Sequence, residues 1–548
     1  MKNNFLLVLI SSLLVYFIGI NINVMDIDAS QYAEMSREMS ITNSFLQVFE
    51  LGKDYLDKPP FLLWASAISI KIFGANNFGY RLPSLLFGLF TLYCTYKFAY
   101  LYYKKEIALL ATLVLATSQA FFLTMHDVRT DTILMSWVIC SIWQIALWFK
   151  HKNFINLAFG CIAIGAGMLT KGPIALIVPV LSFGSHFLVT KNLKLLFKWQ
   201  HIIGLIIIAL VLLPMSVGLY QQFDMQPNKI VNNITGVSGL RFFYWTQSFG
   251  RITGESVWNN NANIFFLAQN MLWAFLPFTI VFFLAVFLEI KKIILNKFSV
   301  YKHEEWICVG GFILTYLALG SSKYQLPHYI FVVLPFAAII IAKFLYALNY
   351  ENLYPKFLIF LEKFHFIIFL LLQLFLGVII FYCFYSALII KILFIIFISC
   401  YVLFFLRKGV SQYFLKLCFF SFIGINFFLN SSIYPSLLKY QAGSTMGEYL
   451  AKNKIPKQNT FIYQNHIWHS LHFYNKAIVL HKDSALMYQS GEFAIMPSEK
   501  ILDFINYKIE FDILFRAETY PVSRLKWAFL NPKTRKLNTL PYAIIKIK

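Results

Sequence analysis

Long apolar runs recur along almost the whole chain, and they restrict its fold more than any other feature. Runs of about 18 or more apolar residues are long enough to cross a hydrocarbon core of about 30 Å as helices. They do not alternate with a period of two, as the strands of a membrane barrel do. Of the 548 residues, 59% are hydrophobic and only 13% are charged, whereas soluble domains carry about 25% charged residues. The sequence therefore predicts a mostly α-helical protein with many membrane-spanning helices.

About thirteen spans are expected. They lie near residues 5–20, 80–100, 107–124, 132–149, 154–170, 173–189, 202–221, 264–288, 306–320, 327–348, 364–382, 385–406 and 415–434. With this count, every lysine-rich loop that lacks compensating acids falls on the side of the N-terminus. The positive-inside rule assigns that side to the cytoplasm. The net charge of +22 is therefore attributed to membrane orientation, and no nucleic-acid partner is expected.

The opposite face is where the sequence places its polar segments. A transmembrane domain over residues 1–440 carries three of them as external loops, at 21–79, 125–131 and 222–262. Residues 441–548 mix lysines with acids and contain short alternating apolar runs, which predicts a small α/β domain on the same side. The histidines of this tail, His466, His469, His472 and His481, lack carboxylates at metal-ligand spacing, so a packed or solvated surface is favoured over a zinc site.

Two motifs in the first external loop suggest chemistry. Asp28 precedes a helical stretch with Tyr32, Met35 and Met39 on one side, which suggests a helix lying at the membrane interface. Capping of that helix by Asp28 is the simpler structural explanation. Farther along, Asp57 and Lys58 precede Pro59-Pro60, which holds Lys58 extended and predicts a new helix just beyond.

Several further charged residues stand at the outer ends of spans. Each of them alone is explained by a side chain that reaches the lipid headgroups. As a set they suit an anionic phosphate at the membrane surface, because lysine and arginine bind phosphate. The set comprises Arg81, Arg129, Asp131, Lys171, Arg241, Arg251 and Lys323.

These motifs, in this order, resemble the bacterial aminoarabinose transferases of lipid A, which belong with the protein O-mannosyltransferases (family 39) to the GT-C class of membrane glycosyltransferases. The resemblance covers most of the first 340 residues. Its motifs are Asp28, Tyr32-Ala33-Glu34, Arg37-Glu38-Met39, Lys58-Pro59-Pro60, Arg81-Leu82-Pro83-Ser84, Arg129-Thr130-Asp131, Leu169-Thr170-Lys171-Gly172-Pro173 and Leu326-Pro327-His328-Tyr329-Ile330.

The resemblance implies a GT-C bundle that transfers a sugar from a polyprenyl (undecaprenyl) phosphate donor to a periplasmic acceptor, first of all lipid A or another envelope glycolipid. Asp28 matches the catalytic carboxylate, and Asp131 matches a supporting acid. Lys58, Arg251 and Tyr329 match residues that hold the donor phosphate. Asp57, Arg81, Lys171 and Lys323 are expected to support the site. Direct displacement would invert the anomeric carbon, because no second nucleophile is evident.

No cofactor is implied with certainty. Ser248 stands where the lipid A enzymes have a histidine, so this sequence gives no support to a divalent metal. The resemblance also implies a multi-pass protein of the bacterial inner membrane with its active face toward the periplasm.

Three alternatives stay open at this point. A protein O-glycosyltransferase of the same class differs only in its acceptor. A transporter or flippase of lipid-linked glycans requires inverted repeats and ionisable groups deep in the bundle, and neither is evident. A surface-glycan polymerase or ligase usually carries its large loop late in the chain, whereas here the charged loop comes first.

Overall fold

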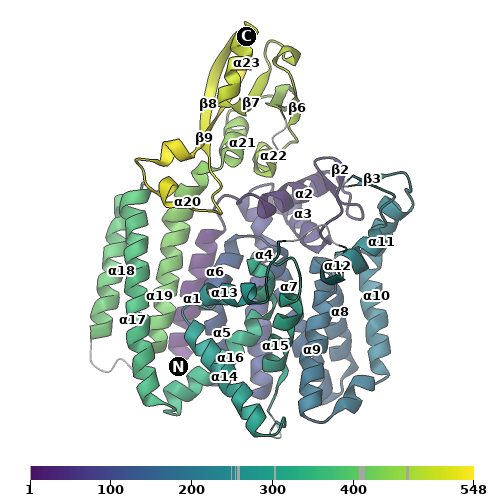
Figure 1. Ribbon diagram of the computed structural model, residues 1–548, viewed down its shortest axis with the longest axis vertical. Coiled ribbons are helices and arrows are strands. Elements are labelled where there is room, and N and C mark those ends of the chain that lie inside the picture. The colour runs from purple at the N-terminus through teal and green to yellow at the C-terminus, as the bar shows by residue number, and fades with distance from the viewer. Residues whose placement is uncertain are drawn as a thin grey trace.

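The computed structural model describes residues 2–231, 233–247, 250–253, 255, 260–300, 304–406, 414–464 and 468–548. Most of them are helical, and the helices form a bundle with a small α/β unit at one end (Figure 1). The first half of the bundle contains α1 (Lys2–Gly19), α4 (Asn77–Tyr102), α5 (Lys105–Thr117), α6 (Gln119–His126), α7 (Thr130–His151), α8 (Phe154–Lys171), α9 (Ile174–Val189) and α10 (Gln200–Leu219). The second half contains α13 (Phe265–Ala274), α14 (Thr279–Leu295), α15 (Ile307–Gly320), α16 (Leu334–Tyr350), α17 (Pro355–Val378), α18 (Leu388–Leu406) and α19 (Phe414–Phe428).

Seven of the described helices are long and apolar enough to cross a membrane, and the number is eight if α5 and α6, which meet at 60°, form one span. Helices lie at each of the thirteen segments expected to span. Within 264–288 the helix is interrupted between α13 and α14, where Pro277 has no amide hydrogen to donate. A mostly helical membrane bundle is therefore confirmed, while the count of thirteen spans stays a prediction.

The first external loop folds into two helices that lie across the end of the bundle (Figure 1). They are α2 (Asp28–Thr42) and α3 (Phe61–Phe73), joined through a hairpin of β1 (Phe49–Glu50) and β2 (Lys53–Asp54). The helix α3 begins directly after Pro60, as the proline pair predicts. The helix α2 is largely buried, since ten of its 15 residues are nearly inaccessible to solvent.

The loop after α10 contains short elements beside the end of α3. They are η2 (Tyr220–Asp224), β3 (Ile230–Val231), β4 (Ile234–Thr235), α11 (Gly239–Arg241), η3 (Phe242–Thr246) and α12 (Gly250–Thr253). The Asp224 carboxylate accepts the Ser238 hydroxyl at 2.5 Å and the Gly239 amide at 3.0 Å, which closes this loop on itself.

The C-terminal unit is built on one mixed sheet of five strands in the order β6-β5-β7-β9-β8. The strand β5 runs parallel to β6 and β7, while β9 runs antiparallel to β7 and β8. The strands are β5 (Thr460–Tyr463), β6 (Leu480–Lys482), β7 (Phe493–Pro497), β8 (Phe511–Thr519) and β9 (Leu540–Ile547). The helices are α20 (Tyr434–Leu437), α21 (Ala442–Lys452), α22 (His469–Asn475), α23 (Ile501–Asn506) and α24 (Trp527–Leu530).

The helix α22 fixes this unit to the first external loop. The His469 imidazole lies 2.7 Å from the Glu50 carboxylate, and the Ser470 hydroxyl donates to Asp26 at 3.1 Å. The Tyr474 hydroxyl accepts the Val24 amide at 2.7 Å, and the Phe473 ring is buried among residues of α2 and α3. Burial raises the pKa of Asp26 above its ordinary value. The C-terminal unit thus holds the start of α2 in place.

Candidate functional site

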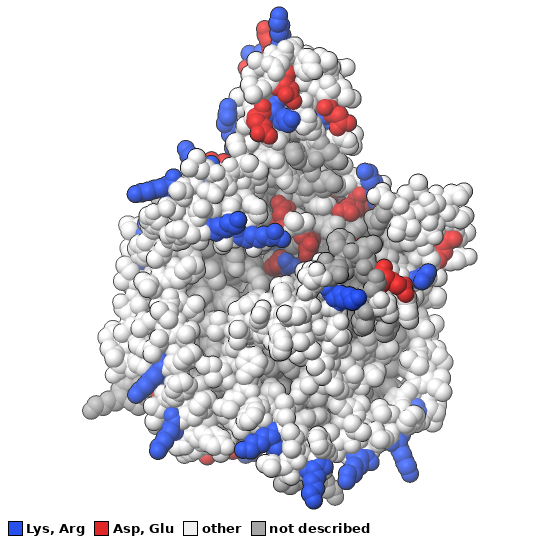
Figure 2. All heavy atoms as spheres, in the orientation of Figure 1, with Lys and Arg blue, Asp and Glu red and all other residues white. Residues whose placement is uncertain are grey.

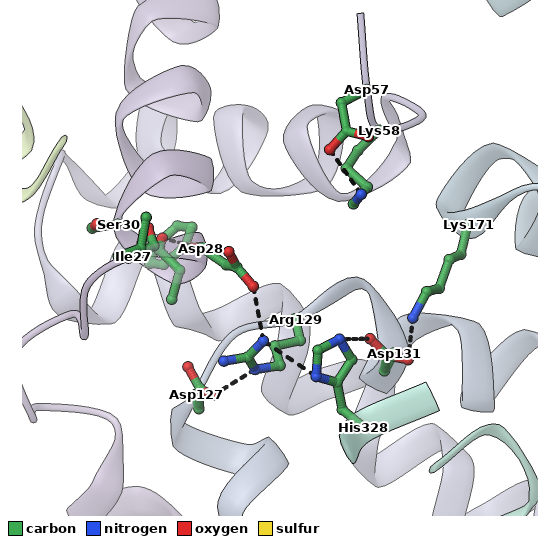
Figure 3. A network of polar contacts seen from close by, with 12 residues as sticks. Ile27, Asp28, Ser30, Asp57, Lys58, Asp127, Arg129, Asp131, Lys171 and His328 are labelled. Atoms are coloured by element: carbon green, nitrogen blue, oxygen red, sulfur yellow. Dashed lines mark hydrogen bonds and ion pairs between the residues drawn. The ribbon is translucent and has the colours of Figure 1, made fainter. Parts of the chain in front are cut away.

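Asp28 is the first residue of α2, and its side chain lies in a network of charged groups at the end of the bundle (Figure 3). Its carboxylate accepts a hydrogen bond of 3.0 Å from the Arg129 guanidinium. The side chain remains 44% exposed, so one face of the carboxylate is open to a second partner.

Arg129, just before α7, contacts three other residues of this network, namely Asp28, Asp127 and His328. Its Nε donates to the Asp127 carboxylate at 2.7 Å, and its Nη1 lies 3.4 Å from Nδ1 of His328. The negative charge of Asp127 keeps the pKa of Arg129 above its ordinary value. The guanidinium is therefore a fixed positive charge beside Asp28.

Asp131, the second residue of α7, forms a second ion pair next to the first. Its carboxylate accepts a hydrogen bond of 2.5 Å from the Lys171 ammonium and lies 3.7 Å from Nε2 of His328. The Lys171 ammonium also lies 4.3 Å from the centre of the Tyr329 ring. Asp131 is 1% exposed, so this pair is fixed by α7, α8 and the turn that precedes α16.

Lys58 approaches the same space from the other side (Figure 3). Its ammonium donates to Asp57 at 2.8 Å, and Asp57 accepts a second hydrogen bond of 2.7 Å from the Gln247 side chain. Lys58 and Asp28 make no direct contact in the described structure, yet Asp28 and Asp57 both act electrostatically on the buried Tyr32 hydroxyl. Burial, strengthened by these two carboxylates, raises the pKa of Tyr32 well above its ordinary value.

An apolar pocket adjoins Lys58. Its polar lining includes Asp57, Lys58 and Gln247. Its apolar lining comes from the first external loop, the end of α10 and the turn η3, and includes Leu46, Leu56, Met215, Leu219, Phe242 and Phe243. The pocket therefore borders α10, a helix long and apolar enough to cross a membrane.

Figure 2 shows how these charges sit on the molecule. Acidic and basic side chains gather in a hollow between the bundle and the C-terminal unit, while Lys and Arg side chains line the opposite end of the bundle. The surface of the bundle between these two ends is nearly free of charge in this view. The polar network therefore lies at one end of an apolar belt.

Two residues expected to support the site lie apart from this network. The Arg81 side chain is 2% exposed, and its guanidinium donates to the carbonyl groups of His126 at 2.7 Å, Asn23 at 3.0 Å and Ile20 at 3.1 Å. Lys323 lies in an exposed turn and only its carbonyl group has a described partner, the Asn260 amide at 3.3 Å. Arg81 thus ties together the ends of α1 and α6.

Arg251 and Ser248 fall on parts of the chain that are not fully described. The backbone of Arg251 belongs to α12, but its side chain is outside the described residues, as is all of Ser248. Three residues of the network were absent from the expected set, namely Asp127, His328 and Gln247. His328 stands inside the recognised motif that contains Tyr329, and Asp127 lies two residues before the motif Arg129-Thr130-Asp131. Nothing in the sequence marks Gln247.

The described residues contain no group of three histidine, cysteine, aspartate or glutamate side chains that could hold a metal ion. Of the tail histidines, His469 pairs with Glu50 and His472 accepts the Val479 amide at 3.0 Å, while His466 is outside the described part of the chain.

The chain is similar to one known family and to several known proteins. Residues 57–217 match the family described as dolichyl-phosphate-mannose-protein mannosyltransferase. A protein of Aquifex aeolicus is 26% identical over 91% of this chain and 93% of its own length. The undecaprenyl phosphate-alpha-4-amino-4-deoxy-L-arabinose arabinosyl transferase of Wigglesworthia glossinidia brevipalpis is 32% identical over 35% of each chain. The matches to such transferases span about a third to a half of their length.

The fold comparison extends over the whole chain. The crystal structure of ArnT from Cupriavidus metallidurans bound to undecaprenyl phosphate superposes with a TM-score of 0.73 at 17% sequence identity, covering 98% of this chain and 97% of that one. The resemblance drawn from the motifs is therefore confirmed: the chain has the fold of the GT-C membrane glycosyltransferases and resembles the aminoarabinose transferases and protein mannosyltransferases among them.

Proposed function

We propose that the chain is an integral-membrane glycosyltransferase that moves a sugar from a polyprenyl phosphate donor, undecaprenyl phosphate in a bacterium, to an acceptor on the periplasmic side, with lipid A as the acceptor of choice. One observation supports this most: Asp28 and Lys58, which matched the catalytic and phosphate-binding residues of the family, face one space from opposite sides (Figure 3). A small apolar pocket that borders the membrane-spanning helix α10 lies beside Lys58.

Lys58 is suited to hold the donor phosphate. When the bond between the sugar and the phosphate breaks, the phosphate gains negative charge, and a cation already in place stabilises that charge. The Lys58 side chain is 22% exposed, and its one described ion pair is with the neighbouring Asp57. Arg251 and Tyr329 are proposed to assist, with Lys171 beside Tyr329 adding positive potential.

Asp28 is suited to receive the acceptor. In the proposed step, the acceptor hydroxyl oxygen forms a bond to the anomeric carbon, the bond from that carbon to the phosphate oxygen breaks, and the hydroxyl proton passes to Asp28. The polyprenyl phosphate leaves with the bonding electrons. Arg129 orients Asp28 through the hydrogen bond of 3.0 Å. Attack from the face opposite the phosphate inverts the anomeric configuration.

The reaction is proposed to take place outside the cytoplasm. The lysines of the loops after α4, α7, α9, α14 and α16 belong to the end of the bundle remote from Asp28, and the positive-inside rule assigns that end to the cytoplasm. Asp28, Lys58 and the C-terminal unit then face the periplasm, and the protein lies in the inner membrane. Residues 441–548 are accordingly proposed to be a periplasmic domain.

The test is reconstitution of the full chain in nanodiscs with undecaprenyl phosphate-linked aminoarabinose and lipid A. The expected result is release of undecaprenyl phosphate together with a mass increase of lipid A. A parallel comparison of lipid A and surface glycans, with and without the gene, identifies the acceptor by mass spectrometry. Absence of transfer to any envelope glycan or protein hydroxyl in both experiments contradicts the proposal.

A further inference from the structure

The chain after β8 forms a basic and partly apolar projection at the outer end of α17 and α18. This segment, residues 522–538, contains α24 and lies beside α20 (Figure 1). Its Val522, Phe529 and Leu530 side chains are buried in one cluster with Ile380 and Phe384, where α17 turns toward α18. The Tyr382 hydroxyl donates to Asn531 at 2.9 Å. The segment is therefore anchored to the helix ends rather than extended away from them.

Arg535 provides the strongest part of this anchor. Its guanidinium donates to the carbonyl group of Cys383, to the Tyr440 hydroxyl at 3.2 Å and to the carbonyl group of Phe529 at 2.9 Å. It also lies 4.6 Å from the centre of the Phe384 ring. The Arg535 guanidinium therefore faces the protein, whereas the other cations of the segment face outward.

Those remaining cations are exposed and uncompensated. They are Arg524, Lys526, Lys533 and Lys536, with Lys439 of the adjoining turn. Within the ranges given above none of the five forms an ion pair with an acid, and the chain contains no Asp or Glu after Glu518. Lys and Arg side chains lie over this corner in Figure 2. Such a group of cations attracts an anionic surface.

Large apolar side chains stand among these cations. Trp527 is 56% exposed, Leu525 46% and Leu537 86%, and Tyr385 of the nearby turn is 90% exposed. Tryptophan and tyrosine concentrate at the level of the lipid headgroups, where their rings are partly apolar and partly hydrated. The combination of cations with such side chains is typical of protein segments that lie on an anionic bilayer surface.

The position of residues 522–538 on the bundle indicates their level relative to the bilayer. The span formed by α17 and its last turn, Pro355–Cys383, and the helix α18 are strongly apolar and expose most of their surface. Both are thus largely surrounded by lipid, and residues 522–538 pack on their outer end. A segment fixed there lies at the height of the headgroups.

We infer that residues 522–538 form a binding surface for anionic phospholipid headgroups of the outer leaflet. The cations hold the phosphates, while Trp527, Leu525 and Leu537 enter the boundary between headgroups and acyl chains. The surface holds the C-terminal unit, and with it α22 and the start of α2, at a fixed height above the bilayer. This inference is independent of the sugar and of the acceptor.

The experiment uses the full chain in detergent micelles and measures energy transfer from Trp527 to dansyl-labelled lipid. The contribution of Trp527 is the difference between the chain and its Trp527→Phe variant. The transfer is expected to saturate at a mole fraction at least about fivefold lower with phosphatidylglycerol than with phosphatidylcholine. The variant with Gln at Arg524, Lys526, Lys533 and Lys536 is expected to lose this preference, since each surface cation contributes about 1 kcal/mol, or about fivefold, to anionic-lipid binding.

A matched variant carries Gln at four exposed lysines elsewhere in the C-terminal unit, namely Lys452, Lys454, Lys508 and Lys546, and is expected to retain the preference. Equal transfer to the two lipids overturns the inference, and so does a preference that survives the four substitutions in residues 522–538. Saturable transfer to labelled lipid A without any response to phosphatidylglycerol also overturns it, because the surface would then bind the acceptor.

Discussion

At the scale of single residues, the proposed chemistry depends on one arginine that contacts three other side chains of the site. Arg129 contacts Asp28, Asp127 and His328 at once, so it couples the first and second external loops to the turn before α16. A hydrogen bond to a charged partner contributes about 1.5–3 kcal/mol. Each of these contacts therefore has a measurable effect on how Asp28 is held.

Asp28→Asn is expected to lower the turnover number at least a hundredfold, because the amide cannot accept the acceptor proton and general-base catalysis contributes about 10²–10⁴-fold. The measurement is release of polyprenyl phosphate by the reconstituted chain. Asp54→Asn is the control, since Asp54 is an external-loop carboxylate paired with Lys229 and Gln222. Retention of more than a tenth of the turnover by the Asp28 variant argues against its proposed role.

Asp127→Asn is expected to lower turnover by about tenfold and to leave donor binding unchanged. The substitution removes the charge that holds Nε of Arg129 at 2.7 Å, so Arg129 orients Asp28 less well, while Lys58 is unaffected. The measurements are the turnover number and the binding of undecaprenyl phosphate, each determined for the chain and for the variant. Unchanged turnover, or a loss of donor binding that matches the loss of turnover, contradicts this positioning role.

The positions of some of these residues could be predicted from the sequence, and those of others could not. Asp28, Lys58 and Asp131 stand in motifs whose neighbours fix their geometry, such as the proline pair after Lys58. Arg81 belongs to an equally clear motif, yet its guanidinium turns toward three main-chain carbonyl groups. Whether a cation faces a ligand or the backbone depends on how loops distant in sequence pack, and no local pattern records that.

At the scale of elements, the contact between α22 and α2 is the least expected feature. Apolar periodicity predicts the individual spans, because each satisfies its own backbone hydrogen bonds and needs only lipid around it. The docking of α22 on the first external loop joins residues more than 400 positions apart, such as His469 and Glu50 of β1. Single-sequence patterns describe local structure, so they did not place the tail against the first loop.

His472 in α22 makes this contact sensitive to acid. Burial lowers the pKa of His472 from 6.5 to about 3, so between these values the unfolded chain binds a proton that the folded unit excludes. Stability is therefore expected to fall as pH decreases from about 6.5 to 3, by up to about 1.4 kcal/mol per pH unit. His472→Asn, which cannot titrate, is expected to flatten this dependence.

The measurement is the midpoint of thermal unfolding of the full chain in detergent at a series of pH values. His481→Asn is the control, because that side chain is exposed on β6. The same acid dependence in the chain and in the His472 variant contradicts the assignment.

At the scale of the whole molecule, charge and lipid together set the orientation. The lysine-rich end and the end that carries Asp28 are separated by the apolar belt seen in Figure 2. The sequence predicts this arrangement because loop charge depends only on the order of the spans. It does not predict the hollow between the bundle and the C-terminal unit, which depends on how the tail docks.

The orientation is testable by labelling introduced cysteines in intact cells. Lys508→Cys, at the end of α23 in the C-terminal unit, is expected to react with a membrane-impermeant maleimide. Lys297→Cys, after α14, is expected to react only after permeabilisation. Six of the seven native cysteines are buried and the seventh, Cys400, lies in the apolar helix α18, so background labelling is low. The reverse pattern places the network in the cytoplasm and contradicts the proposed function.

The most direct test of the proposed site is the binding of undecaprenyl phosphate to the purified chain and its variants. Lys58→Gln is expected to weaken binding at least tenfold, because the phosphate loses its charged partner. Asp28→Asn is expected to bind as well as the unaltered chain, although it no longer transfers sugar. If Lys58→Gln binds undecaprenyl phosphate with unchanged affinity, other residues hold the phosphate. The proposed assignment of phosphate binding to Lys58 and of catalysis to Asp28 is then wrong.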